Sequence, residues 1–131
     1  MTKRIVFDTS AIIDPQGVDL GVLAGATPVV TAVTIAELAF GLDTRDPVER
    51  LRRTERLDDL LARTEVLPFD TAAAKLYGAL AALLRQAGRD PRPRRMDLQI
   101  AATAAVHSLP VVTRNSKDFA GLERAVEVIA V

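Results

Sequence analysis

The chain has 131 residues, and its 17 basic and 17 acidic side chains give a formal net charge of zero. This balance argues against a protein that coats nucleic acid indiscriminately, but it does not exclude a local basic surface. The absence of cysteine excludes disulfides, thiolate metal sites and a cysteine nucleophile. No apolar run approaches the ~20 residues of a membrane span, and Asp8 interrupts the first run too early for a signal peptide. We expect one soluble domain over residues 1–131, in a cytoplasmic setting.

Short apolar runs alternate with longer segments of helical character. In chain order the sequence predicts a strand over 4–7, the start of a helix in 10–13, a turn at 14–17, a strand over 28–33, a helix from Thr34 to Gly41, a charged helix over 48–63, a strand over 66–69, a helix over 70–87, a basic loop over 88–95, a helix over 97–108, and strands over 111–113 and 126–131. Strands that alternate with helices favour a parallel sheet covered on both faces. With right-handed crossovers, this predicts a three-layer α/β/α sandwich with a mainly parallel sheet.

Capping residues define several of these boundaries. Asp46, which precedes Pro47, and Asp70 suit helix N-caps. Gly41 and Gly88 suit helix ends. The helix over 48–63 carries apolar residues on one side, but its many charges are typical of a plain exposed or partner-facing helix.

Four acidic residues stand where a parallel sheet collects ligands, beyond the carboxyl ends of its strands. Asp8 directly follows the first strand, and Asp118 lies just beyond the strand over 111–113. Glu37 and Asp97 are each expected in the first turn of a helix embedded in apolar residues. Neighbouring carboxylates repel unless a cation neutralises them, and hard oxygen ligands select Mg²⁺ or Mn²⁺. Zinc is disfavoured, because the single histidine, His107, is interpreted as a helix-end residue.

Each acid also has a purely structural explanation. Thr34 and Glu37 fit a capping box. Asp97 fits an N-cap or a partner of the helix dipole. Asp8 fits an Asx-type turn, and Asp118 fits the cap of a short turn. A Glu37 side chain committed to its own backbone would not also reach a metal, so the two readings of Glu37 compete.

Four motifs together resemble the PIN-domain nucleases, specifically the VapC-type toxins of bacterial toxin–antitoxin pairs. The motifs are FDTSAII at the start, TIAELAFG in the first third, DLQIAATA late and VVTRNSKDF near the end. The resemblance spans nearly the whole chain. It implies a sheet flanked by helices, an acidic pocket that holds Mg²⁺ or Mn²⁺, and endoribonuclease activity by a metal-activated water. It also implies a homodimer and a tightly bound antitoxin.

The resemblance assigns roles to individual positions. Asp8 and Asp97 match the principal metal ligands, and Glu37 and Asp118 match the third and fourth acids. The supporting polar groups are Ser10, Thr113 and Asn115. Asn115 occupies a position where related sequences carry an acid in some cases. If it replaces an acid here, the site has one charge fewer and a second metal is in doubt.

An acidic pocket needs a basic rim to hold RNA. The candidates are the four arginines near the last two motifs, Arg92, Arg94, Arg95 and Arg114. The alternative is that residues 88–95 form only a solvated loop. On the charged helix, Glu49 and Arg53 are predicted to form an i,i+4 pair worth a few tenths of a kcal/mol.

Three other functions fit a chain of this kind. A phospho-accepting receiver domain also has an Mg²⁺-binding acid pocket, but it wants adjacent acids after the first strand, where this chain has Asp8 followed by Thr9. An aspartate-nucleophile phosphatase wants a second aspartate at position 10, which is Ser10. A catalytically silent binding module stays open. Clustering of the four acids around one cation site would favour the nuclease.

Overall fold

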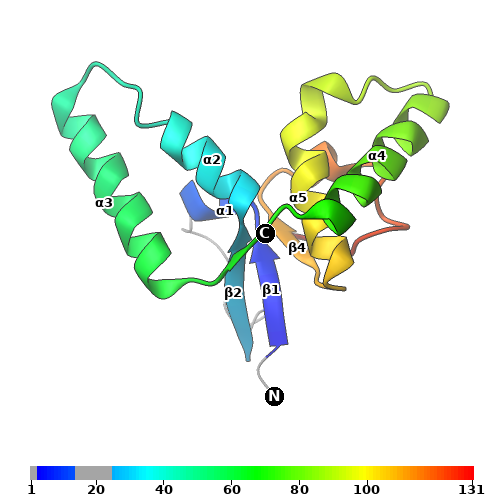
Figure 1. Ribbon diagram of the computed structural model, residues 1–131, viewed down its shortest axis with the longest axis horizontal. Helices are drawn as coiled ribbons and strands as arrows, with labels where there is room; N and C mark the ends of the chain where they lie inside the picture. Colours follow the sequence, from blue (N-terminus) through cyan, green and yellow to red (C-terminus); the bar gives the residue numbers. More distant parts are fainter. Residues whose placement is uncertain (1–2, 14–24) are drawn as a thin grey trace.

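A sheet of five parallel strands forms the centre of the described part of the chain. The computed structural model describes residues 3–13 and 25–131, so the turn predicted at 14–17 lies outside the described residues (Figure 1). The strands are β1 (Lys3–Phe7), β2 (Ala26–Thr31), β3 (Val66–Leu67), β4 (Val111–Thr113) and β5 (Val128–Ala130). Their spatial order is β3-β2-β1-β4-β5, and every pair is parallel. β1 therefore lies at the centre, beside β4, and the predicted α/β fold with a parallel sheet is confirmed.

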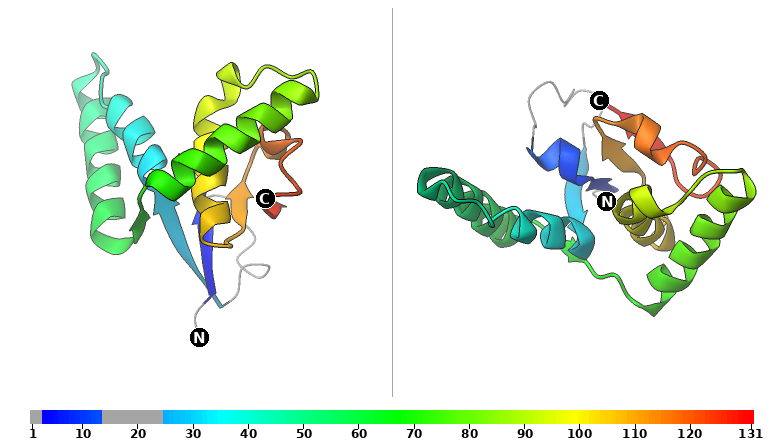
Figure 2. Two further views of the ribbon diagram at one scale, coloured as in Figure 1. Left: turned by 45° about the vertical axis from the view of Figure 1, so that its right-hand side comes forward. Right: turned by 90° about the horizontal axis from the view of Figure 1, so that it is seen from above.

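In the described part of the chain, five α-helices connect and cover the strands. They are α1 (Thr9–Ile13), α2 (Ala32–Phe40), α3 (Pro47–Arg63), α4 (Thr71–Gln86) and α5 (Arg95–Val106), with short 3₁₀ turns η1 (Arg92–Arg94) and η2 (Ser116–Phe119). Figures 1 and 2 show α4 and α5 packed side by side, whereas α2 and α3 form a second arm on the other side of the sheet's upper edge. Among the described residues, no helix is long and apolar enough to cross a bilayer.

The alternation of side chains along the strands builds two cores. Val6, Val29 and Val111 face the larger core, which α4 and α5 complete. Ile5 and Phe7 face the opposite side of the sheet and pack with α1. The two cores make the three layers that the sequence predicts, and burial of β1 on both faces fixes the position of the residue that follows it.

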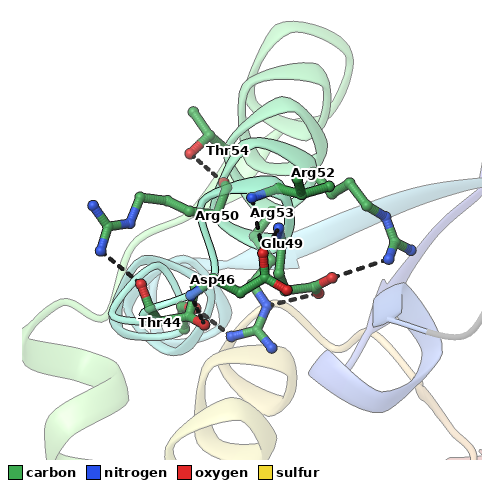
Figure 3. Close-up of polar contacts among 9 residues, drawn as sticks. Thr44, Asp46, Glu49, Arg50, Arg52, Arg53 and Thr54 are labelled. Atoms are coloured by element: carbon green, nitrogen blue, oxygen red, sulfur yellow. Dashed lines mark hydrogen bonds and ion pairs between the residues drawn. The ribbon is translucent and has the colours of Figure 1, made fainter.

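Polar contacts fix the hairpin between α2 and α3, as Figure 3 shows. Arg53 Nη1 donates to the carbonyl oxygen of Gly41 at 2.6 Å, and Arg53 Nε donates to Glu49 Oε1 at 3.0 Å. Asp46 caps α3 by accepting from the backbone N–H of Val48 and of Glu49. The predicted pair of Glu49 with Arg53 and the Asp46 cap are therefore confirmed.

The apolar side of α3 is only partly buried within this chain. Leu57 is buried, whereas Val48 and Leu51 are 67% and 59% exposed. At the end of α2, Phe40 is 80% exposed. These large apolar side chains, together with Leu61, give the α2–α3 arm an uncovered hydrophobic surface.

One predicted helix start is wrong. α2 begins at Ala32 because Thr31 is its N-cap, with the Thr31 hydroxyl accepting from the backbone N–H of Thr34 at 3.3 Å. Glu37 therefore lies in the second turn of α2, and the predicted capping box of Thr34 with Glu37 does not form. The remaining differences are small: β3 and β5 are shorter than expected, and the basic loop contains η1.

Candidate functional site

Asp8 is the most firmly held acid of the site. It follows β1 directly and is 4% exposed. Its Oδ1 accepts from Ser10 Oγ at 2.7 Å and from the backbone N–H of Ala11 at 3.1 Å, and its Oδ2 accepts from Thr113 Oγ1 at 2.6 Å. Asp8 thus caps α1, where the structural explanation expected an Asx-type turn, and its carboxylate is also fixed from β4. Three donors therefore hold the carboxylate in one orientation.

Ser10 and Thr113 link the two strand ends around Asp8. Ser10 Oγ accepts from the backbone N–H of Arg114 at 3.1 Å. Thr113 Oγ1 accepts from the backbone N–H of Asn115 at 3.0 Å. The side chain of Asn115 is exposed, so the residue contributes to this network through its backbone. Ser10 and Thr113 therefore occupy the supporting positions that the sequence analysis assigned to them.

Glu37 projects from α2 toward the start of α1. The hydroxyl of Thr9 donates to Glu37 Oε1 at 2.7 Å and lies 3.2 Å from the buried hydroxyl of Thr34. A cleft of about 340 Å³ opens beside this pair, with Arg53 and Arg56 from α3 in its lining. The carboxylate is thus bound by a hydroxyl from another helix, which explains how an acid is tolerated among apolar neighbours.

Asp97 lies in the first turn of α5, as predicted. The charges of the other three acids affect its pKa. Burial raises the pKa of Asp97 to about 6, and the negative charges of Asp118, Glu37 and Asp8 add to the rise, whereas Arg94 opposes it. The N-cap of α5 is Arg94, so Asp97 is not an N-cap. Asp118 lies within η2 and exerts the largest of the three acidic influences. Asp8, Glu37 and Asp118 therefore lie near enough to Asp97 for their charges to act on its carboxyl group.

The oxygen donors of these residues are those that a hard divalent cation prefers. A cation bound near Asp97 would offset the negative charges of Asp118, Glu37 and Asp8, which add to the rise in its pKa. In residues 3–13 and 25–131, no three acidic or histidine side chains are already gathered closely enough to hold an ion. His107 is the C-cap of α5, as predicted, and lies at the opposite end of the helix from Asp97.

The four predicted phosphate-binding arginines differ in their surroundings. Arg92 is exposed and pairs with Asp90 at 2.9 Å, and Arg95 is exposed at the start of α5. Arg114 is partly buried beside Thr113. Arg94 instead donates to backbone carbonyls, from Nη1 to Ala120 at 3.2 Å and from Nη2 to Lys117 at 3.2 Å. Arg94 therefore differs from the other three arginines, because its guanidinium group donates to the backbone carbonyls of Ala120 and Lys117.

A separate cleft is lined by residues from the segment 85–92, which precedes Asp97 in the chain. Its volume is about 580 Å³, and Arg85, Arg89 and Arg92 contribute to its walls. The acids of the site do not line it. Asp90 also lines this cleft and pairs with Arg92, so the cleft is of mixed charge and separate from the four acids.

The arrangement of acids at the carboxyl edge of a five-stranded parallel sheet matches a known family. The family model of the PIN domain matches residues 5–125 of the chain. The chain belongs to the PIN domain family. This membership rules against the receiver domain and the aspartate-nucleophile phosphatase, and it accounts for the order of the four motifs.

Relatives of this PIN domain bear ribonuclease names. It is 41% identical over 107 residues to Ribonuclease VapC5 of Mycobacterium tuberculosis, covering 77% of this chain and 74% of that protein. It is 32% identical to the tRNA(fMet)-specific endonuclease VapC of Shigella flexneri, covering 69% of this chain and 65% of that protein.

Solved structures agree with the fold. The VapBC-5 toxin–antitoxin structure from Mycobacterium tuberculosis has a chain with a TM-score of 0.84 and 36% identity, and the match covers 98% of each chain. A chain of VapBC from Salmonella typhimurium, solved bound to DNA, has a TM-score of 0.75 and 26% identity over 98% of this chain and 97% of that one. The whole described PIN domain therefore shares its architecture with VapBC-5.

Sequence reasoning missed two parts of the site. Thr9 was noted only as a non-acid after Asp8, yet its hydroxyl holds Glu37. Arg94 was assigned to RNA, yet it binds the backbone of the segment around η2. The position of Thr9 between Asp8 and Ser10 was a usable signal that its hydroxyl belongs to the site. Nothing in the sequence indicates the direction of the Arg94 side chain.

Proposed function

We propose that this PIN domain is a metal-dependent endoribonuclease and the toxin of a toxin–antitoxin pair. The observation that carries the proposal is the convergence on Asp97 of the charges of Asp8, Glu37 and Asp118, which help to raise the pKa of its half-buried carboxyl group. The ribonuclease names of relatives that are 41% and 32% identical support the reaction class. The catalytically silent alternative is the outcome to be tested.

In this proposal Asp8 and Asp97 hold Mg²⁺ or Mn²⁺, and Glu37 and Asp118 complete the acidic set. A bound ion supplies a water of lowered pKa and offsets the charge on the phosphate oxygens. Ser10 and Thr113 keep the Asp8 carboxylate in one orientation. The Thr9 hydroxyl presents Glu37 so that its free oxygen can take a proton from an attacking water.

The rim of the site supplies the affinity for RNA. Arg92 and Arg95 are exposed at the entrance to α5, and Arg114 follows the strand that carries Thr113. The pairing of Arg92 with Asp90 is solvent-exposed, so it exchanges readily for a phosphate oxygen. Because the proposed substrate is RNA, we propose that the protein acts in the cytoplasm.

The proposed partners are an antitoxin and a second copy of the chain. Several solved neighbours are VapBC toxin–antitoxin complexes, and that fact supports a partner of this kind here. The uncovered apolar side chains of the α2–α3 arm offer contact area for such a partner. Light scattering of the isolated chain at micromolar concentration tests the homodimer.

The deciding experiment uses purified, partner-free protein and total RNA. Parallel reactions contain Mg²⁺, Mn²⁺ or excess EDTA. We expect cleavage with either ion and none with EDTA. Asp8→Asn and Asp97→Asn keep the size of the side chains but remove a charge that the cation needs, so each should abolish cleavage while the circular dichroism spectrum stays unchanged. Cleavage by the parent protein in EDTA at the rate seen with Mg²⁺ would contradict the metal dependence. A parent protein that cleaves no RNA with either ion would favour the silent binding module.

A further inference from the structure

The segment that carries Asp118 is held by arginine side chains from outside it. η2 has no side-chain cap at its N-terminus. Arg94 donates to the carbonyl oxygen of Lys117 in the turn and to that of Ala120 directly after it, each at 3.2 Å. Arg89 Nη1 donates to the same Ala120 oxygen at 3.0 Å. The backbone N–H of Ala120 also donates to Lys117, at 3.2 Å, so two guanidinium groups add to the backbone hydrogen bonds at the end of η2.

Arg94 is enclosed to a greater degree than the other arginines of its loop. Its Nε atom is buried and finds no hydrogen-bond partner among the described residues, whereas Arg92 beside it has a side chain that is 83% exposed. Leaving a buried donor unpaired costs stability. The two bonds to carbonyl oxygens hold the guanidinium in this place, so it is not a free cation at the surface.

The position of Arg94 in the chain gives these bonds a consequence for the site. Arg94 is the N-cap residue of α5, and Asp97 lies in the first turn of the same helix. Lys117 and Ala120 flank Asp118 and Phe119, and Phe119 is fully buried. One guanidinium thus ties the start of the helix that carries Asp97 to the turn that carries Asp118.

The chain passes close to α4 directly after η2. Gly121 follows Ala120 with φ of +90°, a conformation that favours glycine. A Cβ atom at this position would lie 3.0 Å from Leu84 Cδ2 and 3.5 Å from Arg89 Nη1. Glycine at position 121 therefore lets the segment that follows Asp118 lie beside Leu84 and Arg89.

We propose that Arg94 is a positioning residue that sets the separation of Asp97 and Asp118, with Arg89 as its auxiliary. The inference rests on the proposed function and deepens it, because it concerns how the chain fixes the positions of two acids before a cation binds. It replaces the phosphate-binding role that the sequence suggested for Arg94. The role calls for the planar guanidinium group of arginine, because its Nη1 and Nη2 atoms donate to carbonyl oxygens of two different residues.

The test is a double-mutant cycle on Mn²⁺ binding, measured by calorimetry without RNA. The proteins are the parent, Arg94→Gln, Asp118→Asn and the double variant. We expect Arg94→Gln to weaken Mn²⁺ binding roughly 10-fold, as loss of an outer-shell partner does. In the Asp118→Asn background the same change should have little further effect, because Arg94 acts through Asp118. Arg94→Lys should remain impaired, since an ammonium group does not span both carbonyls.

Arg63→Gln is the matched control, because it removes one exposed cation that pairs with Asp59 on the same helix. It should bind Mn²⁺ like the parent. Parent-like Mn²⁺ affinity in folded Arg94→Gln, or a loss that is just as large with Asp118→Asn present, would overturn the positioning role. If Arg94→Gln does not fold, Arg94→Lys takes its place in the cycle under the same criterion. A parent protein that binds no Mn²⁺ would instead count against the proposed function itself.

Discussion

Thr113 Oγ1 donates a hydrogen bond to Asp8 Oδ2 at 2.6 Å, between residues that are 105 positions apart in the chain. Both side chains are buried, and the bond joins the carboxyl ends of the central strand β1 and its neighbour β4. It is therefore the direct link between the fold of the sheet and the orientation of the first acid.

Removal of this bond should affect stability and cleavage together. Thr113→Val keeps the shape of the side chain but leaves one oxygen of a buried carboxylate without its donor, so the free energy of unfolding should fall by about 1–3 kcal/mol. Urea denaturation and RNA cleavage are the two measurements. Thr103→Val is the control, because Thr103 is equally buried but donates to Gln99 of its own helix. An equal loss of cleavage in both variants would show that the bond to Asp8 has no special role.

Glu37→Gln separates charge from shape at the third acid. Glutamine keeps the oxygen that accepts from Thr9, so the melting temperature should change little. It cannot take a proton from water, so kcat should fall roughly 100-fold or more. Glu65→Gln makes the same chemical change at an exposed residue paired with Arg4 and should leave kcat unchanged. Full activity in Glu37→Gln would reduce Glu37 to a structural residue.

The raised pKa of Asp97 predicts how stability depends on pH. Burial and the neighbouring acids raise it to about 6, so the native state holds this proton more tightly than the unfolded chain does. In EDTA, the free energy of unfolding should therefore fall as pH rises from about 4 to about 6, by about 1–2 kcal/mol after allowance for solvent screening. Asp97→Asn should remove this fall, and Mg²⁺ should reduce it by favouring the ionised carboxyl. An unchanged pH profile in Asp97→Asn would contradict the assignment.

The salt dependence of RNA binding tests the basic rim. If Arg92 and Arg95 each contact one phosphate, the variant Arg92→Gln/Arg95→Gln should flatten the slope of log affinity against log salt by about 1.4, from about 0.7 per single-strand contact. KM should rise more than kcat falls, and Mn²⁺ affinity should not change. The control Arg63→Gln/Lys75→Gln removes the same charge from α3 and α4. An unchanged slope in the first variant would show that this loop does not bind the RNA backbone.

The sequence predicted those parts of the site that depend on strand ends. Parallel strands share one carboxyl edge, so Asp8 and Asp118 were expected to lie together before any packing was known. The apolar surroundings of Asp97 placed it in the first turn of a buried helix, which is where it lies. These inferences needed only the period of the elements and the direction of the strands.

The rest of the site depends on choices that the sequence leaves open. Thr31 and Thr34 are both good N-cap residues, and the choice of Thr31 moved Glu37 by one turn. The contact of Thr9 with Glu37 depends on how two helices are placed against each other. The direction of the Arg94 side chain depends on carbonyl groups more than twenty residues away in the chain. Local patterns do not determine such tertiary contacts.

The central position of β1 has a consequence for the order in which the site is assembled during synthesis. β1 and Asp8 leave the ribosome early, but the partner strand β4, the Thr113 hydroxyl and Asp118 are made more than 100 residues later. Contacts of such long sequence separation form late and slowly. A nascent chain therefore holds its first acid without the residues that orient and complete the pocket. A chain of this topology therefore completes its acidic site only when its last motif has emerged and folded against β1.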